Sequence, residues 1–193
     1  MSLTLSTMLP LGTISPDFTL PDTVSGKNLS LKELKSECAT LIMFICNHCP
    51  YVLHVNPEII RIANEYIPQS VSFIAISSND VTRYPADAPD KMKQFALEHD
   101  FPFSYLYDES QAVAKAYDAA CTPDFYLFDS KMKLVYRGRL DQSKPNSNIP
   151  LTGEDLRTAL NNTLAGKSLH EKQYPSAGCG IKWRQDLMEI DHF

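Results

Sequence analysis

Residues 40–50 read TLIMFICNHCP, an apolar run that ends at two cysteines separated by two residues. The first part of this run has no alternation of polar and apolar residues, which is typical of a central strand buried on both faces of a parallel sheet. Beyond the second cysteine, apolar residues recur every three or four positions, and this spacing predicts an amphipathic helix that begins near Asn47. A strand therefore delivers Cys46 and Cys49 to the first turn of a helix.

That position favours thiol chemistry, because the unpaired N–H groups and the positive end of the dipole at a helix N-terminus stabilise a thiolate. Two cysteines with this spacing can also close a disulfide on each other, so that one attacks a partner and the other releases it. We predict that Cys46 is the exposed nucleophile and Cys49 the buried resolving thiol. His48 lies between them, and a protonated imidazole there would stabilise the Cys46 thiolate. The alternative is a His48 that faces solvent without a role.

Composition indicates one globular domain over residues 1–193, with a core of about residues 10–165 and a tail of residues 166–193. The net charge of −5 comes from 18 basic and 23 acidic residues without a long block of either sign, so neither nucleic acid nor an anionic membrane is an expected partner. No apolar run approaches the roughly 20 residues that span a bilayer, and the N-terminus does not resemble a secretory signal. We therefore expect a cytoplasmic protein.

Five cysteines, an odd number in a chain of ordinary core composition, favour catalytic or metal-binding use over a disulfide scaffold: Cys38, Cys46, Cys49, Cys121 and Cys179. Cys121 stands two residues before Pro123, and is either a further redox thiol or a buried, inert one. Cys179 lies between two glycines in the tail, where a flexible segment could fold back to resolve a bond on Cys46; the alternative is a packed tail residue. Cys38 is predicted to be structural.

The rest of the chain predicts a mixed α/β fold. A short β-hairpin is expected within residues 15–31, and a surface loop over residues 78–90. Further strands are predicted at 71–77, 103–107, 125–128 and 133–137, the last two as a hairpin, and further helices at 90–98, 110–120 and 152–165.

Four motifs, in this order, carry a family resemblance: CNHCPYV at 46–52, CTPDF at 121–125, YRGR at 136–139 and GCGIKW at 178–183. They resemble the bacterial peroxiredoxin-like proteins of the thioredoxin superfamily, which are related to alkyl hydroperoxide reductase and thiol-specific antioxidant. The resemblance implies a thioredoxin-like fold, in which helices flank a central mixed sheet, with an N-terminal β-hairpin and an inserted βα unit. It also implies a redox-active Cys46/Cys49 pair with Pro123 as a cis-proline packed against it.

A cis bond before Pro123 would turn the backbone of Thr122 toward the thiols and offer its N–H and C=O groups to an extended substrate strand. Two departures favour dithiol exchange over reduction of peroxides. Cys46 stands where a peroxiredoxin carries threonine if Cys49 is the peroxidatic residue, and Pro123 takes the place of the catalytic arginine. Residues 40–45 contain no acid, so the sequence does not identify a proton acceptor for Cys49.

We predict a thiol-disulfide oxidoreductase that serves cell redox homeostasis through the Cys46/Cys49 pair, without a cofactor or metal. Its expected partners are protein or small-molecule disulfides, or peroxides, together with a thiol reductant. One alternative is a peroxiredoxin-like, antioxidant thiol peroxidase. The other is a soft-metal module that binds copper or zinc through Cys46, Cys49 and a nearby histidine or Cys121.

Overall fold

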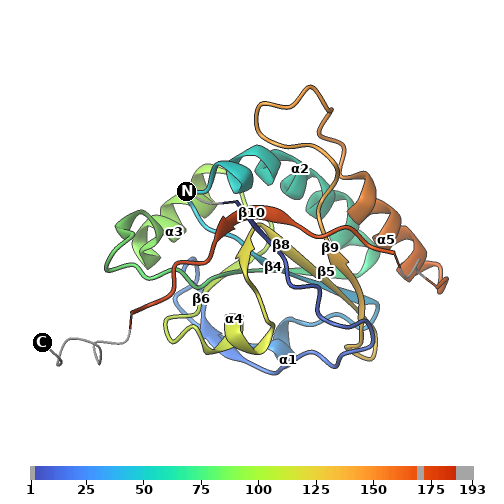
Figure 1. Cartoon of the computed structure of the whole chain (residues 1–193). Coiled ribbons are helices and arrows are strands. Elements are labelled where there is room, and N and C mark those ends of the chain that lie inside the picture. The colour runs from blue at the N-terminus through green and yellow to red at the C-terminus, as the bar shows by residue number, and fades with distance from the viewer. Residues whose placement is uncertain (1–2, 169–171, 186–193) are drawn as a thin grey trace, which may run out of the picture.

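Five strands form a mixed sheet in the order β6-β5-β4-β8-β9 (Figure 1). The central strand is β4 (Ala39–Phe44), which pairs in parallel with β5 (Val71–Ser77) and antiparallel with β8 (Asp124–Asp129). At the edges, β6 (Ser104–Tyr107) is parallel to β5, and β9 (Leu134–Gly138) is antiparallel to β8. Every residue of β4 is buried, as its uninterrupted apolar run predicted.

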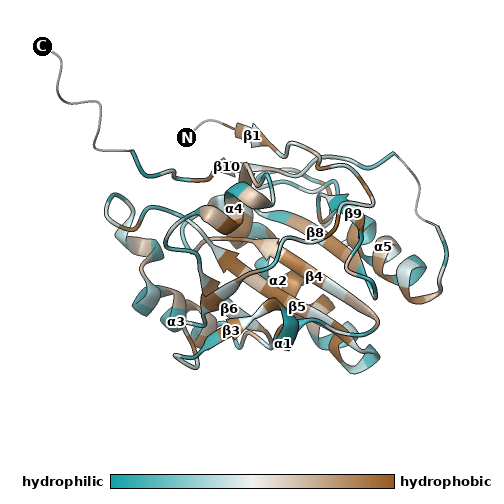
Figure 2. Ribbon diagram, turned by 90° about the horizontal axis from the view of Figure 1, so that it is seen from below, coloured by the Kyte–Doolittle hydropathy of each residue, from teal (hydrophilic) through white to brown (hydrophobic). Residues whose placement is uncertain are grey.

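The computed structural model describes residues 3–168 and 172–185. Alternate residues of β4 belong to two separate apolar clusters, one on each face of the sheet, and the strands of the sheet form a hydrophobic layer between the helices (Figure 2). This arrangement confirms the predicted thioredoxin-like α/β fold, in which a central mixed sheet is flanked by helices. None of the helices in the described ranges is long and apolar enough to cross a membrane.

Helices cover both faces of the sheet (Figure 1). The cluster on one face includes residues of α2 (Pro50–Tyr66), α3 (Pro89–Glu98) and α5 (Glu154–Leu164), whereas the opposite cluster includes residues of α1 (Leu31–Leu34) and α4 (Ala112–Ala116). Two single turns of 3₁₀-helix, η1 (Ile67–Gln69) and η2 (Pro85–Asp87), complete the helical elements of the described ranges.

Helix α2 begins at Pro50, and the prediction of a start near Asn47 was wrong. Proline suits the first helical position because its ring presets φ and because the N–H that it lacks would have no partner there. Cys49 is therefore the residue that caps the helix, and Cys46 lies in the turn before it.

Two small sheets flank the central one. The predicted N-terminal hairpin is present as β2 (Thr19–Pro21) and β3 (Asn28–Ser30), which pair antiparallel. The second small sheet has the order β1-β10-β7 and joins β1 (Leu3–Leu5) and β7 (Cys121–Thr122) through β10 (Ala177–Gly180). The tail that the pattern left without structure thus contributes a strand. A short segment with two glycines has no apolar alternation, so only pairing with distant segments defines it.

Candidate active site

The thiols of Cys46 and Cys49 lie against the Thr122–Pro123 peptide bond, which is cis, as the resemblance implied. Cys46 Sγ lies 3.4 Å from Thr122 Oγ1, and Cys49 Sγ lies 3.2 Å from the Thr122 carbonyl oxygen. The register of the sheet explains this proximity. The last residue of β4 pairs with Asp124 at the start of β8, so the residues that follow β4 meet the residues that precede β8.

Both thiols are buried: Cys46 is 1% exposed and Cys49 is 0% exposed. The prediction of an exposed Cys46 was therefore wrong. A hydrogen bond from the Asn47 backbone N–H to Asp87 holds the segment around η2 against the cysteine turn, and β10 pairs with β7 beside Thr122. Neither contact could be read from local sequence, because each joins segments that are far apart along the chain.

The acidities of the two cysteines differ in the opposite direction from the prediction. The pKa of Cys49 is lowered to about 5, first by the hydrogen bond with the Cys46 thiol and then by the Cys179 thiol and the Val52 backbone N–H, while burial acts in the opposite direction. The pKa of Cys46 is raised well above its usual value by its bond to Cys49, by burial and by the negative charge of Asp87. The lowered pKa and the position at the N-terminus of α2 both favour the thiolate on Cys49 over one on Cys46.

Thr122 acts on Cys49 in the other direction. Its carbonyl oxygen accepts the Cys49 S–H at 3.2 Å and so favours the protonated thiol. The Cys46 thiol, by contrast, can donate its proton to a Cys49 thiolate, and charge-assisted bonds of this kind are the stronger ones. We therefore assign the thiolate to Cys49.

His48 pairs with Asp87 and lies near the Cys46 thiol. Its Nδ1 atom lies 2.8 Å from Asp87 Oδ2, and its ring stacks on Tyr84 with 5.6 Å between the ring centroids. The hydrogen bond with Asp87 raises the pKa of His48, whereas burial lowers it. The positive charge of His48 is thus paired with a carboxylate, and its stabilisation of a Cys46 thiolate stays a prediction. The alternative of a solvent-facing His48 does not hold, because the half-buried side chain is engaged by Asp87 and Tyr84.

Asp87 is the site residue that the sequence did not reveal. It belongs to η2, within the segment predicted as a surface loop, yet it is fully buried. Its carboxylate accepts hydrogen bonds from the Asn47 backbone N–H at 2.8 Å and from Asn79 Nδ2 at 2.7 Å. The residues around Asp87 are rich in proline and aspartate. This composition is typical of exposed turns, so the sequence does not indicate that Asp87 is buried. Asp87 places a carboxylate beside Cys46, although the preceding strand carries none.

Cys179 joins the site from the tail. It is 5% exposed, pairs with Thr122 across the β10–β7 ladder, and shares a hydrogen bond with the Cys49 thiol. Burial, followed by the contact with Cys49, raises its pKa to about 11. The edge of Thr122 that was expected to receive an extended substrate is therefore occupied by the chain's own strand.

Of the two remaining cysteines, one is near the site and one is not. Cys121 is buried, its thiol faces the carbonyl oxygens of Pro123 at 3.9 Å and Ser176 at 4.0 Å, and burial raises its pKa. These features favour the inert alternative for Cys121. Cys38 is exposed, so burial does not support the structural role that was predicted for it.

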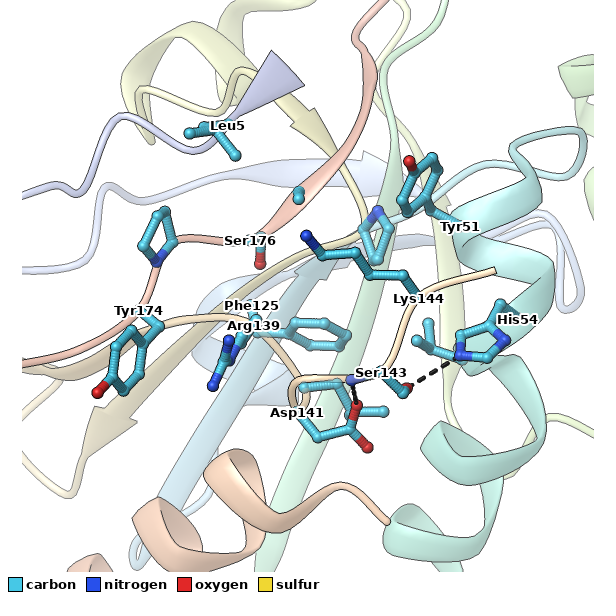
Figure 3. A pocket seen from close by; sticks show the side chains of 15 residues that line it. Leu5, Tyr51, His54, Phe125, Arg139, Asp141, Ser143, Lys144, Tyr174 and Ser176 are labelled. Carbon is cyan, nitrogen blue, oxygen red and sulfur yellow. Dashed lines mark hydrogen bonds between the residues drawn. The ribbon is translucent and has the colours of Figure 1, made fainter. Parts of the chain in front are cut away.

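A pocket of about 210 Å³ has Pro123 in its lining and so adjoins the site (Figure 3). Its walls include the rings of Tyr51, Phe125 and Tyr174, and the Lys144 side chain extends across it in Figure 3. Lys144 has no carboxylate within ion-pair distance among the described residues. A cation above aromatic walls suits a small ligand that combines an apolar part with a negative charge.

The other charged groups of the pocket are largely engaged. Arg139 stacks on the ring of Tyr174, with 4.5 Å to the centroid, and bonds through Nε to Asp155 at 2.6 Å. The carboxylate of Asp141 accepts the backbone N–H groups of Thr152 at 2.7 Å and of Gly153 at 2.6 Å. Lys144 is therefore the cation of this pocket that is available to a ligand.

The ligand set of the predicted soft-metal site differs from the one that the structure brings together. Potential ligand atoms of Cys46, His48 and Asp87 lie within 4.8 Å of one another, whereas Cys49 and Cys121 are not part of the group. His48 Nδ1 and Asp87 Oδ2 are 2.8 Å apart, but two ligands of a tetrahedral zinc ion lie about 3.3 Å apart or more. The geometry therefore fits an ion pair better than a pair of metal ligands.

Comparisons with known proteins agree with this geometry. The sequence pattern of the AhpC/TSA family matches residues 11–137. The chain is 55% identical to an uncharacterized conserved protein from Geobacillus kaustophilus, with a TM-score of 0.95 over 96% of this chain and 98% of that one. It is 40% identical to a hypothetical protein from Sinorhizobium meliloti 1021, with a TM-score of 0.92 over 95% and 100% of the two chains. A peroxidoxin from Mycobacterium tuberculosis shares the fold at 20% identity, with a TM-score of 0.62 over 83% and 100%. No curated protein matches the sequence.

Proposed function

The chain belongs to the AhpC/TSA family, as a peroxiredoxin-like protein of the thioredoxin superfamily, and we propose that it is a thiol-disulfide oxidoreductase with Cys46 and Cys49 as its redox pair. One observation carries the proposal: both sulfur atoms contact the residue before the cis-proline, Cys49 through the Thr122 carbonyl of the cis peptide and Cys46 through the Thr122 hydroxyl. A pair of adjacent thiols, one of them acidic, can accept a disulfide bond from a substrate and hold it as an internal disulfide.

In this proposal Cys49 attacks first, because it is the thiolate. Its sulfur forms a bond to one sulfur of the substrate disulfide, and the first substrate thiol leaves with a proton from solvent. Cys46 then attacks the Cys49 sulfur and releases the second substrate thiol, so that two electrons pass to the substrate and a Cys46–Cys49 disulfide remains. The carboxylate of Asp87, paired with His48, lies next to Cys46 and accepts the proton that this second attack requires.

Exchange of each cysteine for serine tests the order of the two attacks. We expect Cys49→Ser to abolish reduction of disulfides, and Cys46→Ser combined with Cys179→Ser, which removes both neighbouring thiols, to accumulate mixed disulfides on Cys49 that mass spectrometry detects. Accumulation on Cys46 in Cys49→Ser would reverse the order and restore the assignment made from the sequence. Full activity in both variants would contradict the proposed function as a whole.

The burial of the thiols and the character of the pocket favour small, anionic disulfides as substrates. A folded protein would have to reach two sulfur atoms that are almost entirely covered, whereas a small molecule can bind in the pocket beside Pro123 with its negative charge on Lys144. We expect a higher kcat/KM for a small disulfide with carboxylates than for an uncharged disulfide of similar size or for a disulfide-containing protein such as insulin. Equal values for all three would contradict this substrate class.

Reduction of hydroperoxides is a second candidate, favoured by the lowered pKa of Cys49. The thiolate would take one oxygen from the peroxide to become a sulfenic acid and release an alcohol or water; the Cys46 thiol would then form the disulfide and release water. Peroxide consumption no faster than that by free cysteine would exclude this candidate.

A further inference from the structure

Strand β10 occupies the position that an extended substrate would take beside the cis-proline. It pairs antiparallel with β7, with Cys179 opposite Thr122 and Gly180 opposite Cys121. The approach is close: a Cβ atom at Gly178 would lie 1.9 Å from the Thr122 carbonyl oxygen, so only glycine allows the two backbones this contact. Backbone pairing of this type is how extended peptides bind to a sheet edge, and here the bound segment carries its own cysteine.

Hydrogen bonds on both sides of β10 hold it in place. Before the strand, Ser176 Oγ donates to the Gly138 carbonyl at 2.6 Å. After it, the Ile181 backbone N–H donates to the Ala120 carbonyl at 3.0 Å, and the Lys182 carbonyl accepts the Asp80 N–H at 2.8 Å. The position of Cys179 is therefore built into the fold, in contrast to the flexible segment that its two flanking glycines had indicated.

Cys49 is the shared neighbour of two thiols. It is hydrogen-bonded to Cys46, and it is also hydrogen-bonded to Cys179. In thiol–disulfide exchange an attacking sulfur, a central sulfur and a leaving sulfur take part, and the central one bonds to each of the others in turn. The arrangement of the three cysteines, with Cys49 in the middle, matches that requirement.

We propose that Cys179 is a third redox thiol, which takes over the disulfide from Cys46. The proposal rests on the proposed function, because that reaction supplies the Cys46–Cys49 disulfide. The Cys179 sulfur attacks the Cys49 sulfur, the Cys46–Cys49 bond breaks, and a Cys49–Cys179 bond forms. The proton that Cys179 loses ends on Cys46, so no external oxidant or reductant takes part. The transfer restores the Cys46 thiol and moves the disulfide to β10, in the small outer sheet (Figure 2).

Disulfide mapping tests the proposal. All proteins would carry Cys38→Ser, which removes the exposed thiol and prevents links between molecules. Each protein is treated with one equivalent of the thiol oxidant diamide, remaining thiols are alkylated, and the disulfides are identified by mass spectrometry. In Cys46→Ser we expect nearly all oxidised protein to carry a Cys49–Cys179 bond, and Cys46→Ala, which serves as a second variant in case of poor folding, should give the same result.

Two further variants complete the design. In Cys49→Ser the central sulfur is missing. We expect the amount of Cys46–Cys179 disulfide in this variant to be at least tenfold lower than the amount of Cys49–Cys179 disulfide in Cys46→Ser. Cys121→Ser, which removes a buried thiol of the neighbouring strand without a bond to Cys49, should leave the disulfide map unchanged. A Cys46→Ser protein in which Cys179 stays open to alkylation, or in which Cys121 pairs with Cys49 as readily as Cys179 does, would overturn the third-thiol proposal.

Two different outcomes separate the loss of the third thiol from the loss of the proposed function. A protein that reduces disulfides and forms a Cys46–Cys49 bond, but in which Cys46→Ser never forms Cys49–Cys179, retains the proposed function and loses the third thiol. A protein that neither reduces disulfides nor forms Cys46–Cys49 loses the proposed function, even if diamide joins Cys49 to Cys179.

Discussion

Replacement of Cys46 by alanine tests whether the Cys46 thiol sets the acidity of Cys49. The Cys46 hydrogen bond makes the largest contribution to the lowered pKa of Cys49, which is about 5. A hydrogen bond to a charged group contributes about 1.5–3 kcal/mol, and one pKa unit corresponds to about 1.4 kcal/mol. Loss of this donor should therefore raise the pKa of Cys49 by about 1–2 units. Cys46→Ser keeps an O–H donor at the same place and should raise it less.

The assay is the rate at which iodoacetamide alkylates Cys49, measured across the pH range by mass spectrometry of the peptide that contains it. Only the thiolate reacts, so the midpoint of the rate profile reports the pKa. Cys121→Ala, which removes a buried thiol that is not bonded to Cys49, is the matched control and should titrate as the unmodified protein does. The reasoning is refuted if Cys46→Ala has the same midpoint as the unmodified protein, or if the unmodified protein titrates near the ordinary cysteine value.

The same pKa difference affects folding stability. Because Cys49 is more acidic in the folded chain than in the unfolded chain, its ionisation stabilises the folded state fully above the unfolded value near 9.0, and this contribution is lost as the pH falls toward about 5. Cys49→Ala should therefore show a flatter dependence of the free energy of unfolding on pH across this range.

Three further predictions concern neighbouring parts of the site. Gly178→Ala would place a Cβ atom 1.9 Å from the Thr122 carbonyl, so we expect a loss of about 1–3 kcal/mol in the free energy of unfolding; an unchanged denaturation midpoint would contradict the close approach. Asp87→Asn should lower the pKa of His48 in an NMR titration, and should abolish the stabilisation from this pair, which is present at low pH and is lost as the pH rises through the raised pKa of His48. Lys144→Glu should raise KM several-fold for an anionic small disulfide and leave KM for an uncharged one unchanged; equal effects on both would argue against the pocket.

Much of the fold follows from patterns that are local in the sequence. The uninterrupted apolar run of residues 40–45 can be buried only at the centre of a sheet, and the spacing beyond Cys49 can form only an amphipathic helix. The family resemblance carried by the cysteine pair and by the motif with Thr122 and Pro123 implied which two parts of the chain meet. These predictions succeeded because periodicity, turn chemistry and the family motifs are properties of short segments.

The chemistry of the site depends on contacts between segments that are distant in sequence. The pairing of β10 with β7 brings Cys179 to Cys49, and the burial of Asp87 provides the carboxylate that residues 40–45 lack. The same contacts favour the thiolate on Cys49, where the sequence favoured it on Cys46, because hydrogen bonds and burial, which set a pKa, exist only in the folded chain. The sequence alone predicted that Cys46 and Cys49 form a pair of thiols at a helix start. Only the tertiary structure supplied the groups that set the relative acidity of the two thiols, because these groups come from three separate parts of the chain.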